Sequence, residues 1–224
     1  MDLLFTPAKL GTCELKNRIV RSATNGHLSD EKGQVTPLWA DTLIELAKNE
    51  VGLVITGHFC VDKMQRADAG QPVLDETTDE SLLRRACDGV HRYGGKILFQ
   101  LSHSGIKGVE SVNGAPPKHP EDFTREELDR LVEQFAFAAK KCKESGADGV
   151  QVSGIDFNRR AGQKTPFYLD ALICEPDFAA KLKSGAQDGS KCLACNGCYT
   201  IYRKRFVRCV QHQDEIEQFK TIPW

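Results

Sequence analysis

The sequence predicts an α/β protein with parallel strands. Short, continuously apolar runs alternate with longer segments whose apolar residues recur at helical spacing. Strands separated by helices in this way pair in parallel through right-handed crossovers. Four strands and three helices are complete by residue 153, and the rest of the 224-residue chain follows a different pattern.

Four apolar runs are expected to form the strands. They are β-branched or apolar throughout, as in strands that are buried on both faces of a sheet. The runs are RIV at 18–20, GLVIT at 52–56, KILFQL at 96–101 and DGVQV at 148–152. We expect residues 150–153 to form a short buried strand, although polar, arginine-rich sequence follows it in place of a helix.

The first two helices have clear boundary signals. The first begins after Thr36 with Pro37, a capping residue followed by proline at the first helical position. The second is expected to begin at a capping box formed by Thr77 and Glu80, and to end at the glycines 94–95. Apolar residues repeat every three or four positions along both, which predicts one buried face on each.

The third helix has the strongest signals. Thr124 and Glu127 are spaced as a capping box, and apolar residues recur at helical spacing up to Gly146. Further along, residues 176–184 predict a short helix that ends at Gly185.

Composition and charge exclude several classes of partner. The chain has 30 basic and 31 acidic residues, with no block of like charge. Nucleic acid and anionic membrane surfaces are therefore not expected partners. No apolar run approaches the roughly 18 residues of a membrane span, and the N-terminus lacks the pattern of a signal peptide. We expect a cytoplasmic protein that acts on a small molecule.

The carboxyl ends of the first three strands are candidate ligand-binding segments. They read SATNG at 22–26, TGH at 56–58 and QLSHSG at 100–105. Parallel α/β proteins place ligands at these ends. Small residues and amides there can approach a flat polar ligand and form hydrogen bonds with it. Small residues are also common at strand ends without function, so this pattern alone leaves both interpretations open.

Four longer motifs add a family resemblance. LFTPAKLGTCELKNRIVRSATNGHLSD, GLVITG, ILFQLSHSG and ADGVQV occur in this order between residue 3 and about residue 153. Their order and spacing resemble the old yellow enzyme family of flavin oxidoreductases, in its dienoyl-CoA reductase-like branch. The resemblance implies an eight-stranded (β/α) barrel of the TIM type that holds FMN at its carboxyl mouth. It also implies hydride transfer from NAD(P)H, through the flavin, to an activated alkene or a related acceptor.

The resemblance also implies the residues that contact the cofactor. Ala23, Thr24 and Asn25 correspond to residues at the edge and face of the isoalloxazine ring. Gly57 would let the second strand approach the ring. Gln100 would bond the pyrimidine side of the ring, because a carboxamide can both donate and accept there.

The chain also departs from the family pattern. Ser153 stands where the fourth strand of the family ends in the first of two substrate-binding residues, and the family's tyrosine does not follow. No catalytic role is assigned to His58 or His103, since a histidine there can equally brace a loop. Segments are expected to be missing after about residue 152 and near residue 170, because the flanking sequences resemble later parts of the barrel.

These departures predict an incomplete barrel over residues 1–187, shorter than the roughly 250 residues of a complete one. They leave three functions open: an impaired FMN-dependent oxidoreductase, a catalytically inactive flavin-binding remnant, or a small iron–sulfur electron-transfer module. The open edges of such a barrel also predict a homo-oligomer, with the first and fourth strands at the contact.

Residues 188–224 form a cysteine-rich tail with a candidate metal motif. Cys192, Cys195 and Cys198 are closely spaced, and Cys209 follows. Four thiolates at this spacing suit a [4Fe–4S] cluster and resemble the motif of the dienoyl-CoA reductase branch. Zinc and the absence of any metal remain alternatives, although structural zinc sites usually pair two cysteine knuckles and the second one here has a single cysteine.

Overall fold

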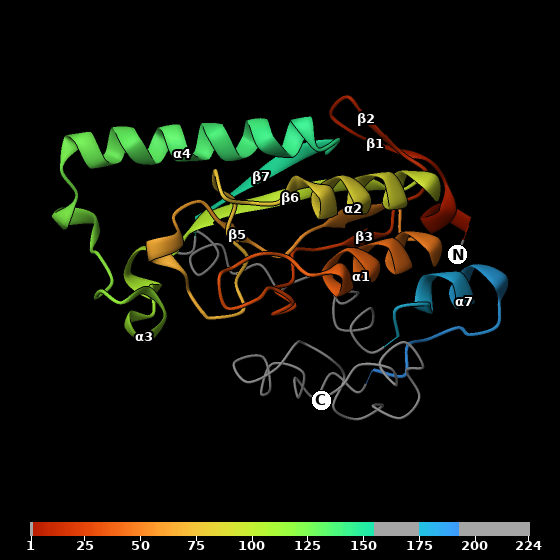
Figure 1. Ribbon diagram of the computed structural model, residues 1–224. Helices are drawn as coiled ribbons and strands as arrows, with labels where there is room; N and C mark the ends of the chain where they lie inside the picture. Colours follow the sequence, from red (N-terminus) through yellow and green to blue (C-terminus); the bar gives the residue numbers. More distant parts are fainter. Residues whose placement is uncertain (1, 155–174, 193–224) are drawn as a thin grey trace.

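The computed structural model describes residues 2–154 and 175–192. Its centre is a parallel sheet with the order β3-β4-β6-β5, in which β7 also pairs with β6. The strands are β3 (Val20–Arg21), β4 (Leu53–Ile55), β5 (Phe59–Cys60), β6 (Lys96–His103) and β7 (Gly149–Gly154). Helices lie along one side of this sheet (Figure 1). The predicted parallel α/β arrangement is confirmed.

Three long helices connect the strands in the predicted order. They are α1 (Pro37–Lys48), α2 (Glu80–Arg92) and α4 (Arg125–Glu144). The capping box of α4 is confirmed: Glu127 N donates to Thr124 Oγ1 at 3.2 Å, and Thr124 N donates to Glu127 Oε2 at 2.8 Å. Among the described residues, no helix is both long enough and apolar enough to span a bilayer.

The capping box predicted for α2 is wrong. Asp79 precedes the helix, and its carboxylate accepts a hydrogen bond from Ser81 N at 2.8 Å. Thr77 instead donates its hydroxyl proton to Asp75 Oδ1 at 2.6 Å, in the turn before the helix. Asp79 is the better cap because an anion is stabilised at the positive end of the helix dipole.

Several short elements were not predicted from the sequence. β1 (Ala8–Leu10) and β2 (Cys13–Leu15) form an antiparallel hairpin before the sheet. The remaining short elements lie before β1 and in the loops that follow β5 and β6: η1 (Asp2–Phe5), η2 (Lys63–Gln65), η3 (Gly105–Lys107), α3 (Glu110–Asn113) and η4 (Pro120–Asp122).

A β-bulge lies at the end of the second predicted strand and separates β4 from β5. Ile55 of β4 pairs with Leu98, and Phe59 of β5 pairs with Leu101, so residues 56–58 lie opposite residues 99–100. An extra residue changes the side of the sheet on which the next side chains lie. The strand therefore continues past residues 56–58, where the sequence predicted its end.

The core lies between the sheet and the helices, and three aromatic rings form its centre. Trp39 of α1 packs edge-to-face on Phe59, with ring centroids 5.6 Å apart, and Phe99 lies 5.5 Å from Phe59. Phe59 and Phe99 are fully buried, and Trp39 is nearly so. The bulge thus brings Phe59 into the same core as Phe99.

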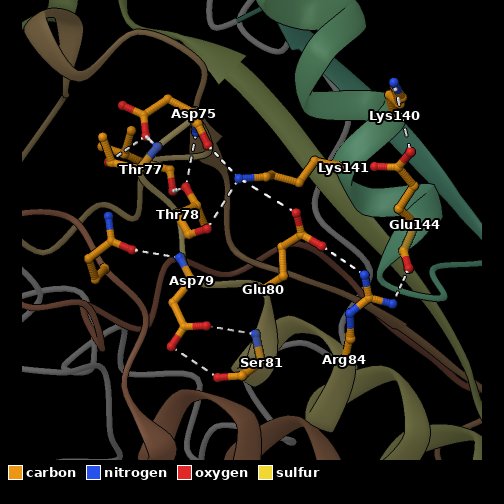
Figure 2. Close-up of polar contacts among 12 residues, drawn as sticks. Asp75, Thr77, Thr78, Asp79, Glu80, Ser81, Arg84, Lys140, Lys141 and Glu144 are labelled. Carbon is orange, nitrogen blue, oxygen red and sulfur yellow. Dashed lines mark hydrogen bonds and ion pairs between the residues drawn. The ribbon is translucent and has the colours of Figure 1, made fainter.

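A buried lysine joins α4 to the loop that precedes α2 (Figure 2). Lys141 Nζ donates to Asp75 O at 2.9 Å and to Thr78 O at 3.1 Å. The same ammonium lies 3.7 Å from Glu80 Oε1 in the first turn of α2. Because its side chain is only 10% exposed, Lys141 must keep these partners to remain inside the protein.

The last described helix, α7 (Phe178–Ser184), packs beside the first strand of the sheet. Phe178, Ala179 and Leu182 belong to the same core as Ile19, next to β3. The helix ends at Gly185, whose φ is 73°, as predicted. In a closed barrel the last helix lies beside the first strand, so the position of α7 fits the expectation that the sequence after about residue 170 resembles a later part of the barrel.

The prediction of a buried fourth strand is wrong. Val150 and Val152 of β7 pair with Phe99 and Leu101, whose side chains face the helices. Yet the two valines are 38% and 66% exposed. The reason is that none of the described residues forms a strand on the outer edge of β7.

Candidate functional site

The carboxyl end of β4 lies directly against the segment that follows β3. A Cβ built on Gly57 would be 2.7 Å from Thr24 O and 2.9 Å from Asn25 Cα, closer than real Cβ contacts. Glycine is therefore required for the two segments to approach each other. Gly57, Thr24 and Asn25 therefore lie together at the strand ends, and Ala23 precedes Thr24 in the same half-buried segment.

Gln100 joins this group from β6. Its backbone N–H donates to Thr56 Oγ1 at 3.1 Å, within the bulge. Its side chain lies on the face of the sheet opposite the helices, because it alternates with the buried Phe99. On that inner face, Gln100 Nε2 donates to Gln151 Oε1 of β7 at 2.7 Å.

Protein groups hold both ends of the Asn25 amide. Asn25 Nδ2 donates to Asp68 Oδ2 at 2.9 Å, and Asn25 Oδ1 accepts from His27 N at 3.1 Å. Asp68 Oδ1 lies 2.9 Å from His27 Nδ1 and accepts from Gly70 N at 2.8 Å. This network fixes the orientation of Asn25 at the strand end.

His58 is braced in its neutral form. Gln71 Nε2 lies 2.7 Å from His58 Nδ1, and Gln71 Oε1 accepts from Ala67 N at 2.6 Å, which orients the amide. An amide nitrogen can only donate, so His58 Nδ1 accepts and the ring proton is on Nε2. Burial lowers the pKa of His58, and the nearby Asp68 carboxylate opposes that effect only in part.

His103 also braces a loop. Its Nδ1 accepts from Gly105 N at 3.1 Å, and its ring packs edge-to-face on Phe123 with centroids 5.8 Å apart. Burial lowers the pKa of His103 below its ordinary value, with a weaker opposing effect from Asp62. Neither histidine has a geometry that requires a catalytic role.

A small cavity lies between the strand ends and α1. It measures about 70 Å³, and Thr24, Asn25 and Gly57 are part of its lining. Ligand pockets usually hold about 300 Å³ or more, so this cavity is too small for a flavin. The inner face of the sheet, where Gln100 and Gln151 lie, is the surface on which a flat ligand could rest.

The other candidate residues are only partly covered by the structure. Ser153 lies on β7 in register with Ser102 of β6. Cys192 is half-buried, and its backbone N–H donates to Ser190 Oγ at 3.0 Å. The remaining predicted ligands lie outside the described residues: Cys195, Cys198 and Cys209. Within residues 2–154 and 175–192, no three histidine, cysteine or acidic side chains are grouped to hold a metal ion.

Sequence reasoning missed three residues of the site. Gln151 could have been found, because aligning the two predicted strands places it beside Gln100. Asp68 and Gln71 come from the loop after η2, which has no periodic pattern. Their contacts depend on how that loop folds back over the strand ends.

Comparison with known proteins gives a family match over most of the chain. The model of the NADH:flavin oxidoreductase / NADH oxidase family matches residues 3–156. A metal reductase of Desulforamulus reducens is 35% identical over 169 residues, which covers 68% of this chain and 24% of that protein. The chain thus spans about a quarter of the length of this relative.

Solved structures show the same fold. A 2-naphthoyl-CoA reductase in complex with 2-naphthoyl-CoA superposes with a TM-score of 0.62 at 23% identity, over 67% of this chain and 27% of that one. An old yellow enzyme homologue from Zymomonas mobilis gives a TM-score of 0.60 at 23% identity, over 66% and 47%. The described fold is therefore part of a (β/α) barrel. With its family match covering more than half of its length, the chain belongs to the NADH:flavin oxidoreductase / NADH oxidase family, that of old yellow enzyme.

Proposed function

We propose that the chain binds FMN on the inner face of its sheet and acts as an NAD(P)H-dependent flavin oxidoreductase on a small-molecule acceptor. The observation that carries this proposal is the meeting of four predicted flavin contacts at the carboxyl ends of neighbouring strands. Thr24 and Asn25 touch Gly57, and Gln100 is hydrogen-bonded to the residue before Gly57.

The inner face fits one end of the cofactor. The pyrimidine edge of the isoalloxazine ring alternates donors and acceptors, which a carboxamide can match. Gln151 holds one N–H of Gln100, and none of the described residues bonds to Gln100 Oε1. A flavin bound on this face would supply hydride transfer from NAD(P)H to the acceptor, and Thr24, Asn25 and Gln100 would hold its ring. The residues of this chain orient the ring for that exchange.

The acceptor that the resemblance favours is an activated alkene. Ser153 is the residue of this chain at the position of the family's first substrate-binding side chain. A single hydroxyl polarises a carbonyl less than a pair of imidazole or amide donors does. We therefore expect slow turnover of alkenes. One relative carries the name metal reductase, which supports testing a non-alkene acceptor as well.

Several narrower expectations stay predictions. A [4Fe–4S] cluster on Cys192, Cys195, Cys198 and Cys209 is one, and so are the boundary of the barrel region at residue 187 and a cytoplasmic location. A catalytically inactive flavin binder and an iron–sulfur electron-transfer module remain the alternative functions.

The test is oxidation of NADH and NADPH by the purified chain, with and without added FMN, using ferricyanide as an acceptor that needs no polarisation. The proposal expects FMN-dependent oxidation above the rate of FMN alone. A folded protein that gives no such increase would contradict the oxidoreductase. FMN binding without an increase in the rate of NADH or NADPH oxidation would favour the catalytically inactive flavin binder. A brown, iron-containing protein that does not bind flavin would favour the electron-transfer module.

A further inference from the structure

The outer edge of β7 has no neighbouring strand within residues 2–154 and 175–192, where β7 pairs with β6 alone. Such an edge presents backbone N–H and C=O groups that can pair with another strand. Natural proteins usually block an open edge with charged residues, proline or a bulge. The sequence of β7, GVQVSG, has no charged residue and no proline, and its pairing with β6 is continuous. Nothing in β7 itself therefore opposes pairing at this edge.

The helix side of β7 is apolar next to the open edge. Val150 and Val152 lie on this side, in register with the fully buried Phe99 and Leu101. The two valines are nevertheless 38% and 66% exposed. Exposed valines beside an unpaired strand edge form a surface suited to another strand with a helix packed over it.

The flank of α4 on the same side of the molecule is also apolar and exposed. α4 runs alongside β7 and contacts both β6 and β7 (Figure 1). Lys141 marks its other flank, because it contacts the loop before α2. Val132 precedes Lys141 by nine residues, which at about 100° per residue places Val132 on the opposite flank. Val132 is 67% exposed, and Leu128, one turn earlier, is 44% exposed.

We propose that a second copy of this chain covers this surface, with the two β7 strands pairing antiparallel around a twofold axis perpendicular to the sheet. Val150 then lies opposite the partner's Val152, and Gln151 lies opposite the partner's Gln151. Valine meets valine twice in this register. Opposite residues of paired strands point to the same face, so the helices of both copies lie on one side of the joined sheet. The contact uses one edge from each copy, and the assembly closes as a dimer.

The spacing of strands and helices fits this arrangement. Because α4 contacts both β6 and β7, its axis lies over the line between these strands. Two strand spacings of about 4.8 Å therefore separate the two α4 axes across the twofold axis, a distance of about 9.6 Å. Packed helices lie about 8–10 Å apart. The exposed flanks of the two α4 helices thus meet as the strands pair.

The size of the contact is that of a reversible dimer. The strand β7 is about 20 Å long and the helix α4 about 30 Å, and a sheet layer with a helix layer is about 20 Å thick. The contact therefore covers on the order of 500 Å² on each copy, or about 1,000 Å² in total, the lower limit of a specific interface. We expect a dissociation constant in the micromolar range. This inference does not depend on flavin binding.

The first test is the molar mass of the full chain by light scattering in reducing buffer, from about 5 to about 200 µM. Val152→Lys places a charge in the contact, and it should leave the monomer folded because Val152 is largely exposed. Met64→Lys is the matched control, since Met64 is 47% exposed and lies in η2, away from β7. The mass of the wild type and of Met64→Lys should rise towards twice 24.9 kDa, while Val152→Lys stays a monomer.

The second test is disulfide cross-linking, which checks the register. In Gln151→Cys the new cysteine lies opposite its own copy, with Cα atoms about 4.5–5.5 Å apart, a distance that a disulfide spans. Ser153→Cys is the matched control on the same face, because the two copies of this residue lie four strand positions, or about 13 Å, apart. After oxidation with diamide, Gln151→Cys should give a dimer band on a non-reducing gel. Ser153→Cys should give only the background of the wild type, which has nine cysteines.

Other outcomes would overturn the proposal. A wild type that stays monomeric at the highest concentration would do so, as would a Val152→Lys variant that dimerises like the wild type. Loss of the dimer in Met64→Lys as well would show non-specific apolar association. Equal cross-linking of Gln151→Cys and Ser153→Cys would exclude the antiparallel register. The cross-linking pair decides even where Val152→Lys does not fold, as judged by circular dichroism.

Discussion

Gln100 on β6 and Gln151 on β7 lie in register and join their side-chain amides, with Gln100 Nε2 2.7 Å from Gln151 Oε1. The bond connects Gln100, which the family resemblance assigns to the flavin, with Gln151, which lies in the ADGVQV motif but to which the resemblance assigned no role. It also fixes the direction of the Gln100 carboxamide, because the oxygen of Gln151 can only accept. The candidate site is thus a property of two neighbouring strands rather than of one motif.

Replacing Gly57 by alanine should destabilise the fold and weaken FMN binding together. The new methyl group would meet the backbone of Thr24 and Asn25, which cannot move like a flexible side chain. We expect a loss of about 1–3 kcal/mol in the free energy of unfolding, measured by urea denaturation. Gly189→Ala is the control, since nothing lies within 4 Å of its added Cβ. Equal stability of the two variants would disprove the close approach.

His58 should make the protein less stable in acid. Burial lowers the pKa of folded His58 from its ordinary value of 6.5, so the unfolded chain binds more protons just below that pH. This contribution to stability is complete above about pH 6.5 and is lost as the pH falls through the lower, folded value. Unfolding free energies from about pH 8 to about pH 5 should fall less steeply in His58→Gln than in the wild type. An NMR titration of the His58 ring with a pKa above 6.5 would contradict this assignment.

Two adjacent lysines on α4 should differ strongly. Lys141→Met leaves the carbonyls of Asp75 and Thr78 without their donor, and should cost about 2 kcal/mol of unfolding free energy. Lys140 is 72% exposed and lies 3.8 Å from Glu144, so Lys140→Met should cost less than about 0.5 kcal/mol. Urea denaturation of both variants measures the difference. Similar values for the two would mean that the buried contacts in Figure 2 do not hold α4 to α2.

Reduction of a cyclic enone should be absent or much slower than reduction of ferricyanide under the same conditions. The enone carbonyl needs hydrogen-bond donors, and Ser153 supplies one hydroxyl where the family has a pair of side chains. Parallel assays with NADH and NADPH give the ratio of the two rates. Comparable rates would refute this prediction and point to a substitute donor, for which Arg159 and Arg160 are the first residues to replace.

Features set by local chemistry could be predicted from the sequence. The capping box of Thr124 and Glu127 and the left-handed Gly185 depend on a few neighbouring residues, and both occur as expected. The cap at Asp79 was missed because two acceptors near the start of α2 compete, and packing decides between them. The bulge at residues 56–58 was missed because its only signal is the pairing with β6.

Features that depend on contacts between residues far apart in the chain could not be predicted from the sequence pattern. Val150 and Val152 look like a buried strand, but burial needs a neighbour on the outer edge, and the described residues supply none. In the site, Gln100 was found through its motif. Asp68 was not, because its contact with Asn25 joins residues far apart in the chain through a loop without periodicity.

The most direct test of the central claim is an FMN titration, followed by quenching of flavin fluorescence, of the wild type, Gln100→Ala and the control Gln134→Ala on α4. We predict weak but saturable binding to the wild type and to Gln134→Ala. Gln100→Ala should bind about tenfold more weakly, since a lost hydrogen bond costs on the order of 1–1.5 kcal/mol. No binding by the folded wild type, or an unchanged affinity in Gln100→Ala, would contradict a flavin site on the inner face of the sheet.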